Sequence, residues 1–564
     1  MSYTVLDNFS NFQIGENGSI EYTWSKNIRE KICQLNFQLT RTRDNSVIHN
    51  LYLQTDSILK DLHSYYNSAT ISKEEYIEYM SIMFRMIGHT RDIIDGKGEY
   101  ALSYMLLGVW HSHHPELAKF ALQHFVLPFG THDHPYGSWK DIKYLYKYTK
   151  SKSLVHYGSK LLITQLKADS VNNNPSLAAK WVPREKSQFG DMFTDLAIDY
   201  FYDYIVTAKN DISRRRAVIK AKMDFRKLIS SLNKKLDTVQ IKQCGLQWAN
   251  IDPTKQTSIT LHKQKRAFLN IDNNGQQRTE TGDRIECANK FNEFIEKALN
   301  GEVEVKGKRI GLNEFTKEAL SLCARNQQNS KEADILNAQW IDNSKQSNGL
   351  GKMIAMVDVS GSMDGEPLNA AIALGIRVAE MSLLGKRLLS FSARPSWINL
   401  EGIDHFVDMV SIIKRSDWGI NANFFTALNM ILDAIIINKM KPEDVQDMVL
   451  AIFSDMQMDK VEPNIDCLMD SIQKQYADAG QRLWKKDFKP PHILFWNLRS
   501  TSGFPSLSRQ KNCSMMSGFS PALLNLFCEE GVNAFQSCTP WSLLVNTLNN
   551  ERYDVLDKHI RENI

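Results

Sequence analysis

The stretch MIAMVDVSGSMDGEP, residues 353–367, joins an apolar run to a polar loop. Five apolar residues lead into Asp358, and Ser360 and Ser362 follow at alternate positions before a glycine turn. In extended backbone this spacing points the three side chains the same way. One carboxylate and two hydroxyls make a hard oxygen site of the kind that suits Mg²⁺ or Mn²⁺. The stretch therefore predicts a buried strand that ends in a candidate metal-binding loop.

Three more apolar runs follow, RLLSFSA (387–393), MVLAIFSD (448–455) and HILFWNL (492–498). They alternate with amphipathic helical patterns over 368–383, 424–440 and 464–479. Alternating strands and helices indicate a doubly wound parallel sheet, with strands buried on both faces. Because ligands bind beyond the carboxyl ends of such strands, Asp455, at the end of its run, is expected near Asp358.

A simpler interpretation is that an Asp-x-Ser-x-Ser string arises by chance and caps the next helix. The context favours the metal-type loop, because the string ends an apolar run inside a repeating strand–helix pattern. Asp455 then adds a second carboxylate at an equivalent strand end.

The first half of the chain has a different pattern. Residues 24–245 contain apolar residues at three- and four-residue spacing, as in KEEYIEYMSIMFRMIGHTRDII (73–94), with few strand signals. This pattern predicts a body of paired helices. Residues 250–345 are more polar, and two segments within them, 270–283 and 325–339, are expected to be loops or a linker on either side of one helix at 287–299. We therefore predict a helical region over 1–345 and an α/β domain over 346–564.

Composition excludes several classes of protein. The 564 residues carry a net charge of only +4, and no run of eighteen apolar residues suggests a membrane span. None of the eight cysteines forms a CxxC pair, which argues against zinc knuckles and redox motifs. Reduced cysteines and the lack of a secretory signal favour the cytoplasm or the nucleus.

The charge is unevenly distributed. Residues 209–266 hold 15 Lys and Arg against 4 Asp and Glu, which favours a surface that faces a polyanion. A helical run over 213–228 and the segment WVPREKS beside Trp181 supply the candidate phosphate contacts. Those candidates are Arg214, Arg215, Arg216, Lys220, Lys222, Arg226, Lys227, Arg184 and Lys186. Trp181 could stack on an unpaired base; the alternative is a solvated basic face with Trp181 in the core.

The strings DVSGSM and FSDM resemble the metal-ion-dependent adhesion site of the von Willebrand factor type A family. That family is doubly wound α/β, and its site combines an Asp-x-Ser-x-Ser loop with a Thr and an Asp from two other loops. The resemblance implies that Asp358, Ser360, Ser362 and Asp455 are Mg²⁺ ligands. Ala422 stands where the Thr is expected, and Thr426 follows four residues later.

The helical half carries the strings RDIIDGKGE (91–99), YGSWKD (136–141) and AAKWVPREKS (178–187). With FSDM they resemble an uncharacterised family of plants, fungi and large DNA viruses that joins a helical region to an A-type domain. More distantly they resemble the Ro autoantigen and its telomerase/Ro/vault (TROVE) module. In those proteins a ring of HEAT-like helical repeats binds structured and misfolded noncoding RNA.

Together these patterns predict a non-enzymatic, RNA-binding ribonucleoprotein scaffold. Its A-type domain would dock an acidic protein ligand, with Mg²⁺ as the implied cofactor and no membrane partner. One alternative is a protein–protein assembly module that does not bind RNA. Another is a metal-dependent phosphohydrolase built on Asp358 and Asp455. The expected location is cytoplasmic, with the nucleus or, for a viral source, the virion as alternatives.

Overall fold

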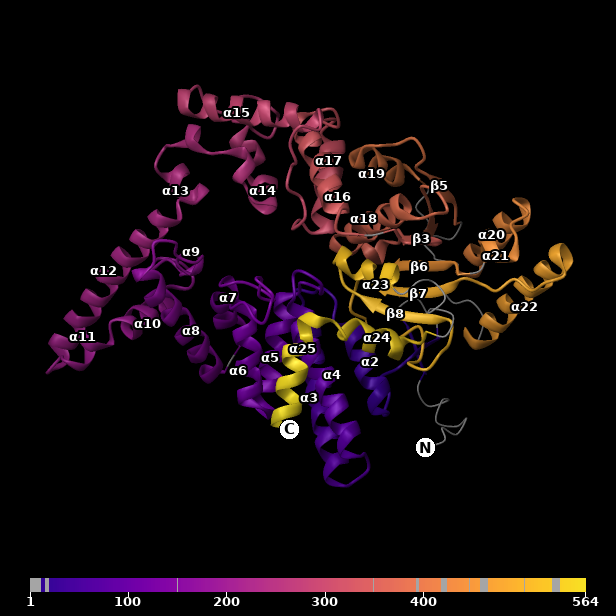
Figure 1. Ribbon diagram of the computed structural model, residues 1–564, viewed down its shortest axis with the longest axis horizontal. Coiled ribbons are helices and arrows are strands. Elements are labelled where there is room, and N and C mark those ends of the chain that lie inside the picture. Colours follow the sequence, from indigo (N-terminus) through magenta and orange to yellow (C-terminus); the bar gives the residue numbers. More distant parts are fainter. Residues whose placement is uncertain are drawn as a thin grey trace.

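A computed structural model shows a helical body joined to a six-stranded sheet (Figure 1). The structure describes residues 12–15, 20–149, 151–347, 349–391, 395–416, 424–445, 447–456, 465–501, 503–529 and 538–564. The predicted α + α/β layout is confirmed, with the sheet confined to the second half of the chain. The finer predictions of an A-type domain and of HEAT-like repeats stay predictions.

The sheet has the strand order β5-β4-β3-β6-β7-β8, in which only the edge strand β5 runs antiparallel. All four predicted strands are present. The bounds are β3 (Met353–Asp358), β4 (Arg387–Phe391), β5 (Trp397–Asn399), β6 (Val449–Ser454), β7 (His492–Asn497) and β8 (Cys513–Ser517). A separate hairpin pairs β1 (Phe12–Ile14) with β2 (Ile20–Tyr22).

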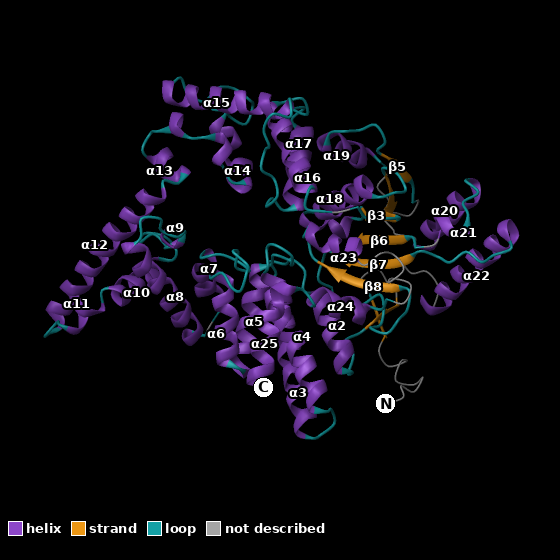
Figure 2. Cartoon of the chain, in the orientation of Figure 1, coloured by secondary structure: helices purple, strands orange, loops and turns teal. Residues whose placement is uncertain are grey.

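Both faces of the sheet are buried, as the apolar strands predict. Along β3, Ile354 and Met356 face one hydrophobic core, whereas Met353, Ala355 and Val357 face another. The helices of this half of the chain include α18 (Glu366–Met381), α19 (Phe406–Arg415), α20 (Phe424–Ile437), α21 (Pro442–Val445), α22 (Ile465–Trp484) and α23 (Leu526–Glu529). Of these, α18 packs on β3, β4 and β6, and α20 packs on β4 (Figure 2).

The first half of the described chain is almost entirely helical. Its bundle comprises α2 (Ile28–Gln38), α3 (Asn45–Asn67), α4 (Lys73–Arg91), α5 (Tyr100–His113), α6 (Pro115–Val126), α7 (Lys140–Tyr148), α8 (Lys152–Val171), α9 (Ala178–Trp181), α10 (Gly190–Tyr200) and α11 (Tyr202–Val206). The helix α4 begins with a capping box in which the Ser72 hydroxyl and the Glu75 carboxylate each accept a backbone N–H.

The helix α12 (Asp211–Leu236) is the longest of the described helices. Figure 1 shows it leading away from α10 and α11 toward α13 (Val239–Cys244), with α14 (Ser258–Phe268) and α15 (Gly282–Leu299) beyond. A third core, which includes Phe268 and Phe291, holds α14 and α15 together. The polar segment 270–281 is a loop, as predicted.

The prediction that residues 325–339 form a loop or linker is wrong, because α17 (Lys331–Ser344) covers much of that segment and packs beside α16 (Leu312–Ala324). Buried Leu336 and Trp340 of α17 and buried Phe315 of α16 share one core with the sheet. Four-residue spacing of buried positions within a polar sequence is enough to anchor α17.

Packing crosses the division near residue 346. The helices α24 (Pro540–Leu548) and α25 (Asp554–Asn563) follow the sheet in sequence but pack on α4 of the first half. Buried Tyr553 and Leu556 belong to the same core as the helical bundle. Among the described helices, none is long and apolar enough to cross a membrane.

Candidate functional site

The Asp-x-Ser-x-Ser loop lies at the carboxyl end of β3, where the sequence places it. Asp358 is buried; its Oδ1 accepts the Ser360 N–H at 2.9 Å, and its Oδ2 accepts the Ser454 hydroxyl at 2.6 Å. The hydroxyl oxygens of Ser360 and Ser362 are 3.1 Å apart. Burial raises the pKa of Asp358 to about 6, and the charge of Asp455 acts in the same direction.

Asp455 follows the last residue of β6 and is fully buried. The Nε and one Nη of Arg499 each lie 2.9 Å from its Oδ2. Arg499 stands two residues after the end of β7, at the same edge of the sheet. We did not predict Arg499 from the sequence. The rule that parallel strands end at one edge, applied to the string HILFWNLR, would have indicated it.

The predicted metal ligands are brought together only in part. The contacts above join Asp358, Ser360 and Ser362 to the end of β6; Thr426 is the third residue of α20. Ala422 lies outside the described residues. Within the described ranges, no group of three or more His, Cys, Asp or Glu side chains could hold a metal ion.

Three charged residues of RDIIDGKGE and YGSWKD, namely Arg91, Asp92 and Asp141, make buried structural contacts. Arg91 forms a buried two-bond pair with Asp141 of YGSWKD, with both distances 2.8 Å. Asp92 forms a similar pair with Arg552, which lies between α24 and α25. These motif residues therefore connect distant parts of the chain, and their burial keeps them from contacting a ligand directly.

Lys97 of the same string attaches the helical body to the sheet. Its ammonium donates to the carbonyls of Asn36 and Leu39 and to the Ser517 hydroxyl at the end of β8, at 2.7, 3.0 and 2.6 Å. The side-chain amide of Asn497 donates to the carbonyl of Phe37 at 3.0 Å. The end of α2 therefore covers the β7–β8 part of the edge that carries Asp358.

The predicted RNA contacts gather on and beside α12. Arg214, Arg215 and Arg216 are exposed and have no ion pair with any described residue. Glu185 connects WVPREKS to the helix, because it pairs with both Lys222 and Arg226. The remaining candidates are also placed: Lys220 lies 4.3 Å from the Tyr204 ring, Lys227 is 3.9 Å from Asp224, and Arg184 and Lys186 are exposed on either side of Glu185.

Trp181 is half-buried and lies among lysines that the sequence analysis missed. The ammonium groups of Lys140, Lys143 and Lys180 lie 5.7, 5.3 and 6.0 Å from its ring centroid. Burial lowers the pKa of all three lysines; for Lys140 the charge of Asp141 acts in the opposite direction, and the charge of Lys263 lowers the pKa further. None of the four has an acidic ion-pair partner among the residues that the structure describes. We call Lys140, Lys143, Lys180, Lys263 and Trp181 the Trp181 cluster.

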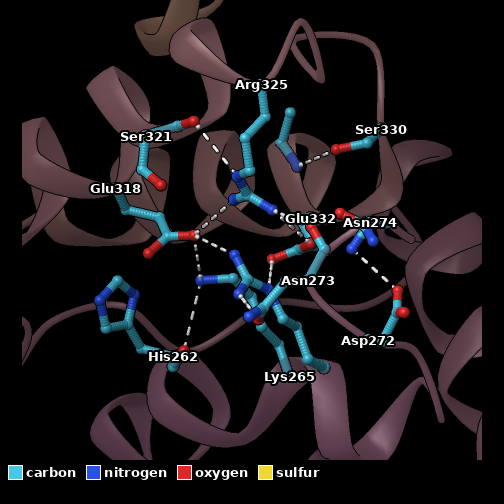
Figure 3. A network of polar contacts seen from close by, with 12 residues as sticks. His262, Lys265, Asp272, Asn273, Asn274, Glu318, Ser321, Arg325, Ser330 and Glu332 are labelled. Carbon is cyan, nitrogen blue, oxygen red and sulfur yellow. Dashed lines mark hydrogen bonds and ion pairs between the residues drawn. The ribbon is translucent and has the colours of Figure 1, made fainter. Parts of the chain in front are cut away.

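Two cations at the end of the basic block point inward. Lys265 is buried with its ammonium 3.3 Å from Glu318, and Arg266 pairs with buried Glu332 at 2.7 Å. Figure 3 shows Glu318 and Glu332 between Lys265 and Arg325, at the junction of α14, α16 and α17. Lys265 and Arg266 therefore pair with acids inside the fold, and neither belongs to the exposed basic surface on and beside α12.

Comparison with known proteins adds two similarities. Residues 352–554 match a family model described as Domain of unknown function (DUF7788). Over 498 residues the chain is 27% identical to "Uncharacterized protein L728" of Acanthamoeba polyphaga mimivirus, covering 84% of this chain and 80% of that protein. The first match spans the sheet with its crossover helices, and the second extends well into the helical body.

Proposed function

We propose that this chain is a non-enzymatic RNA-binding scaffold whose helical body contacts structured noncoding RNA. The observation that carries the proposal is the Trp181 cluster. It places three ammonium groups within 6.0 Å of a partly exposed indole, and none of them forms an ion pair with an acid among the described residues. Like charges held together cost free energy, and a phosphate backbone would offset that cost.

The two parts of the basic surface suit two features of folded RNA. Lysines around an indole suit an unpaired nucleotide, because the base stacks on the ring while cations meet the flanking phosphates. The unpaired arginines Arg214–Arg216 on α12 suit a neighbouring phosphate backbone, which needs charge but no particular base. A structured RNA offers both features in one molecule.

The test is a salt titration of RNA binding by the full chain, measured by fluorescence anisotropy with a stem-loop RNA. The triple variant Arg214→Gln/Arg215→Gln/Arg216→Gln should bind on the order of tenfold or more weakly. It should also reduce the slope of log affinity against log salt by about 2. The matched control is Lys290→Gln/Lys297→Gln/Lys331→Gln, which removes three exposed charges from α15 and α17.

A second variant separates stacking from charge. Trp181→Ala should weaken binding of a loop nucleotide by about 1–3 kcal/mol while leaving the salt slope unchanged. Equal affinity of the wild type, both arginine and tryptophan variants and the control would overturn the RNA proposal.

One observation favours the protein–protein assembly module instead. Ile212, Ile219 and Met223 lie on the outward face of α12, with exposed fractions of 66%, 66% and 40%. Aliphatic side chains bury well against another protein but do not stack on bases. A partner protein that stays bound after nuclease treatment and in high salt, and that no longer binds Ile212→Gln/Ile219→Gln, would favour this function over RNA binding.

The α/β half is proposed to dock an acidic protein ligand at the carboxyl edge of its sheet. Two features support this role: Ser362 is exposed there, and Arg43 reaches Glu366 beside the loop while remaining 83% exposed. Engagement of both carboxylates by protein groups counts against the phosphohydrolase alternative. The proposed location is the cytoplasm, with the nucleus or a virion as alternatives.

A further inference from the structure

The carboxyl edge of the sheet already contains a positive charge. The Arg499 Nε–H donates a hydrogen bond of 2.9 Å to Oδ2 of Asp455, and one Nη of the same guanidinium lies 2.9 Å from that oxygen as an ion pair. The Asp455 side chain is 0% exposed and that of Arg499 is 32% exposed, so the cation lies between the buried carboxylate and solvent. A buried, ionised carboxylate is stable only when a cation such as this guanidinium pairs with it.

The other carboxylate is engaged as well. Both oxygens of Asp358 accept hydrogen bonds, one from the backbone of Ser360 and one from the hydroxyl of Ser454. Ser454 ends β6, directly beside Asp455, so the same short segment holds both carboxylates. The two acids are close enough for the charge of Asp455 to act on Asp358.

These contacts do not fit the Mg²⁺ site that the sequence pattern implies. Mg²⁺ requires near-octahedral oxygen ligands at about 2.0–2.1 Å and gives up its water reluctantly. A divalent ion between Asp358 and Asp455 would stand close to the Arg499 guanidinium in a largely buried region, where like charges repel strongly. The Ser360 and Ser362 hydroxyls alone supply too few ligands to offset that repulsion.

We propose that Arg499 is a built-in cation that takes the place of a metal ion at this edge. The guanidinium neutralises Asp455, and its planar fork fixes the carboxylate as a coordinated ion would. A ligand that reaches the edge then meets Arg499 and the serine hydroxyls, without Mg²⁺. The inference does not depend on RNA binding or on docking, because metal binding is measured on the protein alone.

The test is a Mn²⁺ titration of the full chain followed by electron paramagnetic resonance, repeated with Mg²⁺ by calorimetry. The wild type should show no saturable site up to about 10 mM, beyond the weakest usual protein sites for divalent ions. Arg499→Gln should acquire one site, because Asp455 then loses its cation and an ion beside Asp358 and the serine hydroxyls no longer meets a competing positive charge. Arg499→Lys, which keeps a cation, is the matched control and should not acquire it.

A second measurement covers the risk that Arg499→Gln is poorly folded. Mg²⁺ should raise the unfolding temperature of Arg499→Gln and leave that of the wild type unchanged, since a ligand stabilises only the state that binds it. The gain should disappear in Arg499→Gln/Asp358→Asn. Saturable binding by the wild type that is lost in Asp358→Asn would overturn the proposal. So would the absence of any site in Arg499→Gln, because Arg499 would then not be what keeps the ion away.

Discussion

The carboxyl edge of the sheet and the Trp181 cluster both gather charged side chains, but only at the edge are the charges paired with opposite charges. At the edge, buried Asp455 has Arg499 as its partner. In the Trp181 cluster, Lys140, Lys143 and Lys180 share an aromatic ring, and none of them forms an ion pair with an acid among the described residues. Balanced charges hold a fold together, whereas unbalanced ones indicate that something outside the chain balances them.

This difference indicates which charged residues are structural and which are candidates for function. The charged strings that are most conspicuous in the sequence, RDIIDGKGE and YGSWKD, form buried pairs such as Arg91 with Asp141. Two of the unbalanced lysines come from motif strings as well, Lys140 from YGSWKD and Lys180 from AAKWVPREKS, so the motif alone does not separate balanced from unbalanced charges. If the comparison holds, mutations in the two kinds of region should affect stability in opposite directions.

The largest expected effect is on a balanced pair. Arg91→Met should lower the free energy of unfolding by about 3–5 kcal/mol, because it leaves the buried Asp141 carboxylate without its cation. Denaturant unfolding followed by circular dichroism measures this. Arg91→Met/Asp141→Leu should recover much of the loss, since no unpaired charge then remains buried. A loss of unfolding free energy below about 1 kcal/mol in the single variant would contradict the claim that balanced buried pairs hold the fold together.

The next effect depends on pH and concerns Lys97. Burial lowers the pKa of Lys97 to about 7, below the usual lysine value of 10.5. Between these two values the unfolded chain binds more protons than the folded one, so the contribution of Lys97 to stability rises as pH increases. Lys97→Met removes this dependence. The wild-type minus variant difference in unfolding free energy should rise from pH 7 to 9 by up to about 1.4 kcal/mol per pH unit. Two parallel stability curves would show that the ammonium is solvated.

Much of the sheet could be predicted because its central strands are short apolar runs. The sequence did not predict the edge strands β5 and β8, and the reason differs between them. The strand β5 has only three residues, and β8 reads CSMMS, which lacks the branched and aromatic residues that favour strands. The helix α17 was mistaken for a loop because many of the positions that it buries, such as Glu332, Asn337 and Gln339, are polar and leave no clear apolar pattern.

The candidate site was predictable only as far as local pattern reaches. Asp358 and Asp455 follow from strand ends, a rule that depends on the sheet alone. Arg91 meets Asp141 across 50 positions of sequence, and Lys140 meets Trp181 across 41, only because helices pack together. A single sequence carries no local signal for such pairings. Composition therefore located the basic block correctly but did not separate inward Lys265 from outward Arg215.

The smallest expected effect has the opposite sign, and it tests the other side of the comparison. Lys143→Met keeps the aliphatic contact with the Trp181 and Phe189 rings but removes one of the converging charges. Burial lowers the pKa of Lys143, so its charged form is held at a cost that methionine does not have. We expect the free energy of unfolding to rise by up to about 0.5 kcal/mol, while RNA affinity falls. Lys331→Met, at an exposed lysine that pairs with Glu296, is the control and should change neither quantity measurably. A destabilised Lys143→Met that binds RNA normally would mean that the lysine is part of the balanced framework, and the contrast between the two regions would then fail at the Trp181 cluster.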